Sequence, residues 1–556
     1  MLPFYIFLQK CELQNVGLSY TDTFSCSFFI SILILYLCLF FNFSLFYVIY
    51  SVALIVSLYL YLKNRFKLIH FEDQKFKSFL ISIGFLYWMV PSLIHEYPLG
   101  WDPYFHGLLA ESIKQSQSII YNWLPQSKIP LTYPIAINNL IAIIANFLDL
   151  PIHIVFKSLF SIFSIPMAMQ VYSFVNKGTN AKDVSLVSML IFLFTTNHVG
   201  ISNYEWGGLP NLVALWASIT MATLVFKTND QNFKIYASLL SVLFISITLI
   251  HHHSMVTIGV QLLLLALWAK FKWESNLYLK LIPYIFLTSL PFLIRYALKI
   301  PLLKYTYLTN YYEPAVTPLR LFELWGGPLI LFFIIGCLLA MKKRIELQCI
   351  PIFKWNAYYF LAMLILFDYI FRFIYFLNYG KNISFFTATR FSGHLTFYLF
   401  PIASLPIIAL TRKLKQSKRI LLCTLLFCTI LSTSKYKVFL RPPVKESMVN
   451  AYHWIRDNTP KSTFVINTFI EAPYITKRKS LLLPLPASEP VKLRKTISYK
   501  RQLLEGQIPA DFEQYKNIVL IVTPENQLIL SKLLQNRSTV LKDFSNGIRV
   551  VSIKKL

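Results

Sequence analysis

Charged residues are scarce in this sequence, at 14% of its 556 residues, whereas a soluble protein carries about 25%. Hydrophobic residues account for 56% of the chain and the mean hydropathy is +0.54. Apolar runs close to the roughly 20 residues that span a bilayer recur along the chain. This composition excludes a soluble globular protein and predicts a polytopic α-helical membrane protein.

Acidic residues are the scarcer charge, with 25 Asp and Glu against 53 Lys and Arg, which gives a formal net charge of +28. In a membrane protein, Lys and Arg collect in cytoplasmic loops. The excess of positive charge therefore needs no nucleic-acid partner, and we predict none. Membrane lipid is the predicted surrounding of most of the chain.

Cysteine and glycine are also few, at 7 and 16 residues. No two cysteines form a Cys-x-x-Cys pair and none lies in the last 120 residues, which argues against a disulfide framework or a structural zinc site. Transporters often show paired repeats and helices broken by Gly or Pro. We find no internal repeat, which argues against a transporter or channel. That class is kept as the alternative interpretation.

Fourteen apolar runs are candidate spans, and the basic loops between them indicate their orientation. By the positive-inside rule, the basic loops at 63–77, 269–280, 342–344 and 412–419 should be cytoplasmic. The candidate spans are 27–42, 44–62, 79–95, 135–150, 152–175, 184–201, 209–226, 235–250, 254–270, 279–298, 328–341, 355–377, 394–411 and 419–434.

The run at 135–150 is the weakest candidate, because it is short and holds three Asn and one Asp. If it crosses, the loop charges of the two halves disagree by one crossing, so we expect it to lie at the outer interface. This leaves thirteen predicted transmembrane helices, of which the first is a retained anchor. The N-terminus is then inside and the C-terminus outside. The predicted location is the cell membrane.

Residues 436–556 have a different composition from the rest. An amphipathic helix over 445–458, ended by Asn458, Thr459 and Pro460, precedes strand-like runs at 463–467, 517–524 and 548–554. We predict two domains: a multi-span transmembrane domain over 1–435 with an external loop at 96–134, and a small extracytoplasmic α/β domain over 436–556.

The external loop holds "HEYPLGWDPYFHGLLAESI" (95–113), in which Asp102 and Pro103 are a good helix start. Asp102 could be only a helix cap. Alternatively, Asp102 and His106, four residues apart, project from one face at the membrane surface. A carboxylate there binds a divalent metal or accepts a proton from an attacking hydroxyl.

Residues 94–113 resemble the first external loop of the GT-C glycosyltransferases, especially the catalytic subunit of oligosaccharyltransferase. The stretch Ile94–Glu96 and the Asp-Pro-Tyr-Phe of 102–105 match, with four extra residues before the Asp. "LTYPIAINNLIAII" (131–144) is similar to the Tyr-Pro start of the segment that follows this loop. The resemblance assigns the family's catalytic or metal-binding Asp to Asp102.

Three later stretches extend the resemblance in the expected order. "SNYEWGGLPNLVALW" (202–216) is similar to the second external loop, whose acidic residue would be Glu205. "ATRFSGHLTFYLFPIASLPI" (388–407) is similar to the span whose Arg contacts the donor's phosphates, which falls on Arg390. "AYHWIRDNTPKSTFVIN" (451–467) is similar to the start of the family's external domain. The Trp-Trp-Asp-Tyr-Gly motif that grips an acceptor sequon does not follow it.

The resemblance implies a glycosyltransferase that uses a polyprenyl-phosphate-linked sugar donor at the outer membrane face, with an unassigned acceptor: protein, lipid or glycan. It implies a divalent metal, Mg or Mn, held by Asp102 and Glu205. A GT-C-shaped scaffold without catalysis is a further alternative.

Two other positions are candidate substrate-binding residues. His251 is the first of three consecutive His at a predicted helix end, where polar interface residues are the simpler explanation. The resemblance allows one His to face the donor phosphate. Glu313 lies in the predicted external loop 299–327 among tyrosines that an aromatic belt explains equally well. It is the lesser candidate for a carbohydrate groove.

Overall fold

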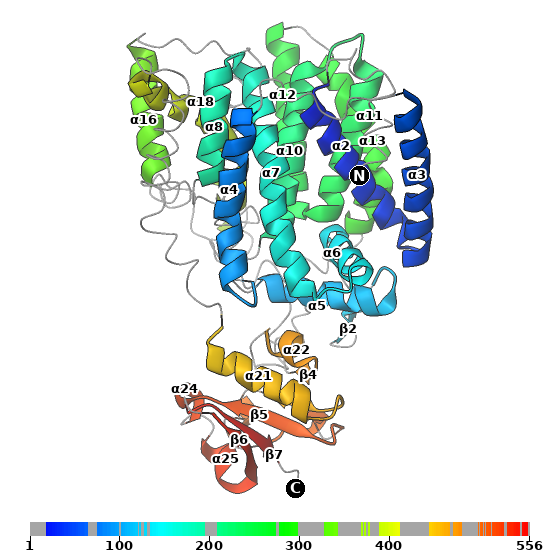
Figure 1. The fold of residues 1–556 in the computed structure, drawn as a ribbon, viewed down its shortest axis with the longest axis vertical. Helices are drawn as coiled ribbons and strands as arrows, with labels where there is room; N and C mark the ends of the chain where they lie inside the picture. The colour runs from blue at the N-terminus through cyan, green and yellow to red at the C-terminus, as the bar shows by residue number, and fades with distance from the viewer. Residues whose placement is uncertain are drawn as a thin grey trace.

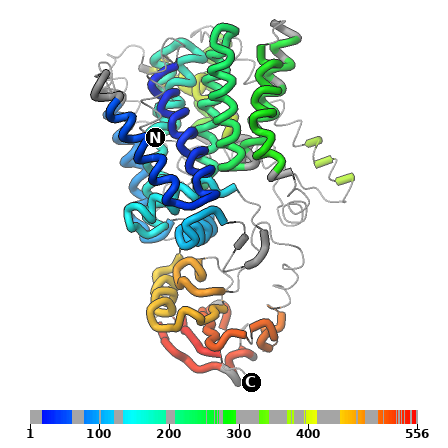
Figure 2. Tube along the Cα trace, turned by 90° about the vertical axis from the view of Figure 1, so that its right-hand side faces the viewer, coloured from blue at the N-terminus to red at the C-terminus, as the bar shows by residue number. Residues whose placement is uncertain are grey.

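The computed structural model describes most of residues 18–64, 75–98, 102–194, 208–297, 327–342, 388–411, 444–480 and 499–553, and a few positions within 369–377. A bundle of long apolar helices forms one end of the molecule, and a smaller region with a β-sheet forms the other (Figure 1). The turned view in Figure 2 shows the same two parts, with the C-terminal region again beyond one end of the bundle.

The described helices of the bundle agree closely with the predicted spans. Five of them are long and apolar enough to cross a membrane by length and composition. The predicted spans 355–377 and 419–434 lie mostly or entirely outside the described residues. The helices are α2 (Tyr20–Cys38), α3 (Phe43–Asn64), α4 (Lys75–Ile94), α7 (Ile152–Thr179), α8 (Lys182–Phe194), α10 (Leu209–Lys227), α11 (Phe233–Ile250), α12 (His252–Trp273), α13 (Leu277–Ala297), α16 (Gly327–Met341) and α18 (Ala388–Thr411).

One end of the bundle carries α5 (Asp102–Ser116) and α6 (Ala136–Phe147) and contacts the C-terminal region. We call this the junction end and the opposite one the far end. The end of α2 is at the junction end, because the amide of Ile119, just beyond α5, donates to the carbonyl of Leu39. Helix α2 begins at the far end, where a polar network joins it to α7 and α10.

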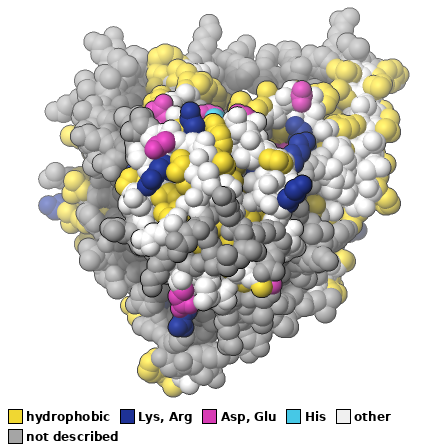
Figure 3. All heavy atoms as spheres, turned by 90° about the horizontal axis from the view of Figure 1, so that it is seen from below, with side chains coloured by type: hydrophobic (Ala, Val, Ile, Leu, Met, Phe, Trp, Pro, Cys, Tyr) yellow, Lys and Arg dark blue, Asp and Glu magenta, His cyan; other side chains and the backbone are white. Residues whose placement is uncertain are grey.

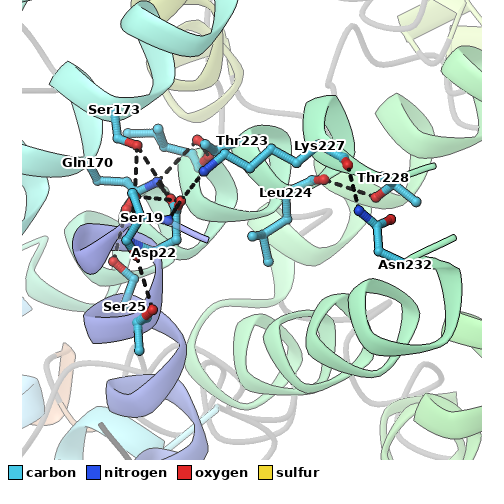
Figure 4. Close-up of polar contacts among 12 residues, drawn as sticks. Ser19, Asp22, Ser25, Gln170, Ser173, Thr223, Leu224, Lys227, Thr228 and Asn232 are labelled. Carbon is cyan, nitrogen blue, oxygen red and sulfur yellow. Dashed lines mark hydrogen bonds and ion pairs between the residues drawn. The ribbon is translucent and has the colours of Figure 1, made fainter. Parts of the chain in front are cut away.

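The far-end network is centred on the carboxylate of Asp22, which is 0% exposed (Figure 4). Lys227 at the end of α10 donates to it over 2.5 Å, and Gln170 of α7 donates over 3.1 Å. Ser19 completes a capping box with Asp22 at the start of α2. A buried charge requires such partners, so the network fixes the polar start of α2 inside the bundle.

Helix α6 lies alongside α5 rather than along the long helices of the bundle. The Asn138 amide contacts the His106 ring, and Lys114 donates to the carbonyl of Ala145, so both ends of α6 are next to α5. Its 12 residues are about 18 Å long, short of the ~30 Å hydrocarbon core. This arrangement supports the prediction that 135–150 does not cross. The total of thirteen spans stays a prediction.

The C-terminal region contains a five-stranded mixed sheet in the order β4-β3-β5-β7-β6. Strand β3 pairs in parallel with β4 and β5, and β7 pairs antiparallel with β5 and β6. The elements are α21 (Glu446–Asn458), β3 (Phe464–Ile466), α22 (Glu471–Thr476), β4 (Lys479–Ser480), β5 (Ile518–Val522), α24 (Pro524–Gln527), α25 (Ser531–Arg537), β6 (Ser538–Asp543) and β7 (Arg549–Ile553).

The sequence predicted the positions of β3, β5, β7 and α21. These stretches were recognisable because they carry the most apolar and most strongly periodic residues. Strand β6 is mostly exposed, so no hydrophobic pattern marks it in the sequence. Seen from below, the described basic and acidic side chains of this part of the molecule are interspersed with uncharged ones (Figure 3).

Candidate functional site

Asp102 is the first residue of α5, and Pro103 follows it in the first turn. Proline suits the first turn of a helix, because the backbone amide that it lacks would have no partner inside the helix. The Asp102 side chain is partly exposed, whereas residues 103–110 are buried. The predicted helix is therefore present, and it places a carboxylate at the junction end with access to solvent.

His106 does not share the exposure of Asp102. Its side chain is 2% exposed, its Nδ1 lies 3.1 Å from the Asn138 amide nitrogen, and its ring stacks on Phe156 at 6.4 Å. Although Asp102 and His106 are one turn apart, the imidazole faces α6 and α7. These contacts favour a role of His106 in holding α5 on the bundle over direct contact with a substrate.

Arg390 lies in the first turn of α18, at the junction end. Gly393, one turn later, lies next to Leu215 of α10: a Cβ added to Gly393 would be 3.4 Å from Cδ2 of Leu215. Further along α18, the Tyr398 ring contacts Phe174, which stacks on Phe226 close to the far-end Lys227. Helix α18 therefore runs from the junction end to the far end, with Arg390 at its junction-end start.

Glu205 and Glu313 lie outside the described residues, so their side chains are not placed. Gly208, three residues after Glu205, is described again and precedes α10 directly. Because Lys227 at the other end of this 19-residue helix is at the far end, Gly208 is at the junction end. The starts of α5, α10 and α18 thus share one end of the bundle.

His251 lies between α11 and α12, also at the junction end. Helix α11 begins beside Lys227, whose carbonyl accepts from Asn232, and it ends at Ile250. The His251 side chain is 2% exposed, and its Nδ1 lies 2.8 Å from the Ser254 hydroxyl. The predicted helix end is present, but the imidazole is enclosed rather than open to solvent.

The stretch before Asp102 makes contacts that sequence reasoning missed. Lys157 of α7 is buried and donates to the backbone carbonyl of His95 over 2.5 Å. The Tyr97 hydroxyl lies 2.8 Å from Nε2 of His453 on α21. Burial, reinforced by the neighbouring Glu96 carboxylate, raises the pKa of Tyr97 above its usual value of 10.0, so Tyr97 stays protonated and able to donate.

These contacts join residues far apart in the chain, and no spacing signal in the sequence marks them. Tyr97 and His453, for example, are 356 positions apart. The sequence motif contains the aromatic residues of 95–105, but it gives no indication of their contact partners on α7, α21 and α22.

Hard divalent cations take carboxylate and other oxygen ligands. Among the residues that the structure describes, no three His, Cys, Asp or Glu side chains come together in a way that could hold a metal ion. Asp102 is the described member of the predicted carboxylate pair, and its partial exposure suits a ligand role. Its predicted partner Glu205 is among the residues not described.

The sequence matches no known family model, and no curated protein matches it significantly. The fold, in contrast, has counterparts among solved structures. ArnT from Cupriavidus metallidurans bound to undecaprenyl phosphate is similar with a TM-score of 0.58 and 10% identity, over 86% of this chain and 98% of that one.

Two further structures share the architecture. The Archaeoglobus fulgidus oligosaccharyltransferase tethered to an acceptor peptide is similar with a TM-score of 0.52 and 10% identity, over 87% of this chain and 75% of that chain. The arabinofuranosyltransferase AftD from Mycobacteria is similar with a TM-score of 0.50 and 10% identity, over 86% and 40%. The chain therefore has the same fold as ArnT and the archaeal oligosaccharyltransferase.

Proposed function

We propose that the protein is an integral membrane glycosyltransferase that takes its sugar from a polyprenyl-phosphate-linked donor. One observation carries the proposal. In a fold shared with ArnT bound to undecaprenyl phosphate, the starts of α5, α10 and α18 lie at the same end of the bundle. These are the three places to which the sequence resemblance assigns an Asp, an acidic residue and a phosphate-binding Arg.

The residue roles follow from their chemistry. Asp102, with Glu205, either accepts the proton of the acceptor hydroxyl or holds a Mg or Mn ion, which would supply positive charge beside the donor phosphate. Arg390 binds the donor's phosphate, because a guanidinium forms paired hydrogen bonds with phosphate oxygens. His251, His106 and Glu313 are secondary candidates for substrate contact. The two histidines rank below Asp102 and Arg390 because their side chains are buried.

Transfer then proceeds by displacement at the anomeric carbon. The acceptor hydroxyl loses its proton to the carboxylate, its oxygen bonds to the anomeric carbon, and the polyprenyl phosphate leaves with the electrons of the broken C–O bond. Leaving-group charge develops on the phosphate, where a fixed cation stabilises the transition state. The acceptor stays unassigned, since the sequon-gripping motif is not present in the sequence.

We assign the junction end to the outer face of the membrane. The basic loop 63–77 links α3 to α4, the loop 269–280 links α12 to α13, and 412–419 follows α18. The described helix ends that flank these loops, namely the ends of α3, α12 and α18 and the starts of α4 and α13, lie at the far end, opposite the C-terminal region (Figure 1). The positive-inside rule makes that end cytoplasmic, so the C-terminal region is extracytoplasmic.

The test is sugar transfer by the purified full-length chain in liposomes. A panel of polyprenyl-phosphate monosaccharides is supplied with a membrane extract as acceptor source, and release of free polyprenyl phosphate is measured by mass spectrometry. Asp102→Asn removes the charge with little change of shape and should lower release about 100-fold or more, as expected for loss of a catalytic acid–base group.

Asp149→Asn is the matched control. Asp149 is exposed in the turn between α6 and α7, at the same end of the bundle, with a positive φ of 50° that Asn adopts as readily. This variant should keep wild-type release. Equal release from wild type and Asp102→Asn would reduce Asp102 to a helix cap and refute the proposed mechanism.

A further inference from the structure

Helix α5, which begins at Asp102, is enclosed between the bundle and the C-terminal region. On one side, His106 and Lys114 bond to α6. On another side, Tyr104, Gly107 and Glu111 all contact α22 or the residues directly after it. Their spacing of three and four residues places them along one helical face. The C-terminal region therefore packs along two turns of the helix that carries Asp102.

Gly107 is the closest point of this contact. A Cβ added to Gly107 would lie 2.6 Å from Cε2 of Tyr474 and 3.0 Å from Cδ2 and Cζ of the same ring. Real Cβ atoms essentially never approach another atom to 2.6 Å, so an alanine at this position would require the Tyr474 ring or the helix to shift. The face of α5 has a notch at Gly107, and the Tyr474 ring occupies it.

The Tyr474 ring has little freedom to move aside. It is 3% exposed, and its centroid lies 5.8 Å from that of Tyr104 and 6.5 Å from those of Tyr97 and His153. Burial raises the pKa of Tyr474 well above 10.0. The phenol is thus a neutral group enclosed by aromatic rings from α5, α7 and the loop before α5.

A charged pair extends the contact one turn further. Lys477 bonds to the Glu111 carboxylate over 3.0 Å, and its ammonium lies 4.7 Å from the centre of the Tyr474 ring. Both side chains are partly exposed, so solvent screening makes the ion pair a weak contribution. The ring in the notch is the stronger element of the junction.

We infer that Tyr474 is a positioning residue for the Asp102 end of α5. The inference rests on the proposed function in one respect, since it takes Asp102 as the catalytic carboxylate. The Tyr474 ring sets the distance between α5 and the C-terminal region. A helix displaced by about 1 Å carries its first turn with it, and a displacement of that size costs up to about 100-fold in rate.

Gly107→Ala tests the inference, because the two possibilities predict opposite changes in the stability of α5. Alanine has a higher helix propensity than glycine, so an unconstrained α5 would become more stable in this variant. A ring held in the notch predicts the reverse. Amide hydrogen exchange of 102–116 and of 471–476 in the full-length chain should become about tenfold faster. The transfer rate at saturating donor should fall about 10- to 100-fold with little change in donor KM.

Two further variants separate this effect from general damage. In Gly259→Ala on α12, the new Cβ meets its nearest neighbour at an ordinary 3.5 Å, so exchange and transfer should match wild type. Adding Tyr474→Leu to Gly107→Ala makes room for the methyl group, and should restore most of the transfer rate and of the α5 protection.

Three outcomes would overturn the inference: unchanged exchange of α5 in Gly107→Ala, an unchanged transfer rate in that variant, or no recovery in the double variant. If wild type itself transfers no sugar, the proposed function fails. The exchange experiment then still decides whether Tyr474 holds α5 in place, so the two failures are distinguishable.

Discussion

At the residue scale, the ion pair of Asp22 and Lys227 is the most enclosed charge contact among the described residues, with side-chain exposures of 0% and 10%. Removing one member of a buried pair leaves the other charge without compensation, at a cost of about 3–5 kcal/mol. Asp22→Ala should therefore lower the thermal stability of the purified chain markedly. Thermal unfolding in detergent is the measurement.

Asp183→Ala is the control for that variant, because Asp183 is exposed in the first turn of α8 at the same end of the bundle. Loss of an exposed first-turn carboxylate costs about 0.3–1 kcal/mol. A melting temperature of Asp22→Ala equal to that of the control would show that the pair contributes nothing to stability.

Arg478 is a second residue whose role the sequence did not indicate. Although it lies between two lysines in the basic run 477–479, Arg478 is only 6% exposed. Its guanidinium donates to the carbonyls of Arg456 and Thr459 at the end of α21 and to that of Thr476. A fork of donors satisfies helix-end carbonyls that have no partner within the helix.

Arg478→Lys keeps the charge and removes the fork, so it should destabilise the C-terminal region by roughly 2 kcal/mol. Faster amide exchange of α21 in the full-length chain is the expected readout. Arg501→Lys, whose side chain is 81% exposed and pairs with Glu505, should leave that exchange unchanged. Equal effects of the two substitutions would contradict the assigned role.

At the element scale, the sequence predicted most helices because hydropathy in a membrane protein follows the bilayer. The start of α2 was an exception. The run 27–42 was predicted, whereas the helix begins at Tyr20. Its first turns hold Asp22 and Thr23, which hydropathy rejects. Their partners lie as far as 205 positions away, a relation that one sequence does not reveal.

The same limit applies to the candidate site. The Asp102 helix start and the end of α11 before His251 were predictable, because caps and Asp-Pro pairs act locally. The burial of His106 was not, since helical spacing alone places it near Asp102 without showing that α6 covers it. The contacts of Tyr97 and Tyr474 depend on tertiary packing between distant segments and left no local pattern.

Helix α6 yields a topological prediction. We expect α6, which lies along α5, not to cross the membrane, so the residues before and after it should be on the same side. Short epitope tags are inserted at Asp149 and at Asn180, the residue that ends α7. In intact cells an antibody should label the tag at Asp149, which is expected outside. The tag at Asn180 is expected inside and should be labelled only after the cells are permeabilised. Labelling of Asn180 from outside would reverse the assigned orientation of α7.

At the scale of the whole molecule, the described candidate site residues are gathered at one end of the bundle. The starts of α5, α10 and α18 lie there, and the C-terminal region covers part of it. The ends of α3, α12 and α18, which the basic stretches follow in the sequence, lie at the other end. A lipid-linked donor has its tail in the bilayer and its phosphate at the interface. We therefore expect the lipid-linked donor to bind at the junction end.

The most direct measurement is a cryo-EM structure of the full-length chain in lipid nanodiscs with undecaprenyl phosphate added. We expect the phosphate at the junction end, in contact with Arg390 at the start of α18 and on the same side of the bundle as Asp102. The Arg390→Ala variant should show no such density. A phosphate bound at the far end, or at the junction end equally well without Arg390, would contradict the proposed site.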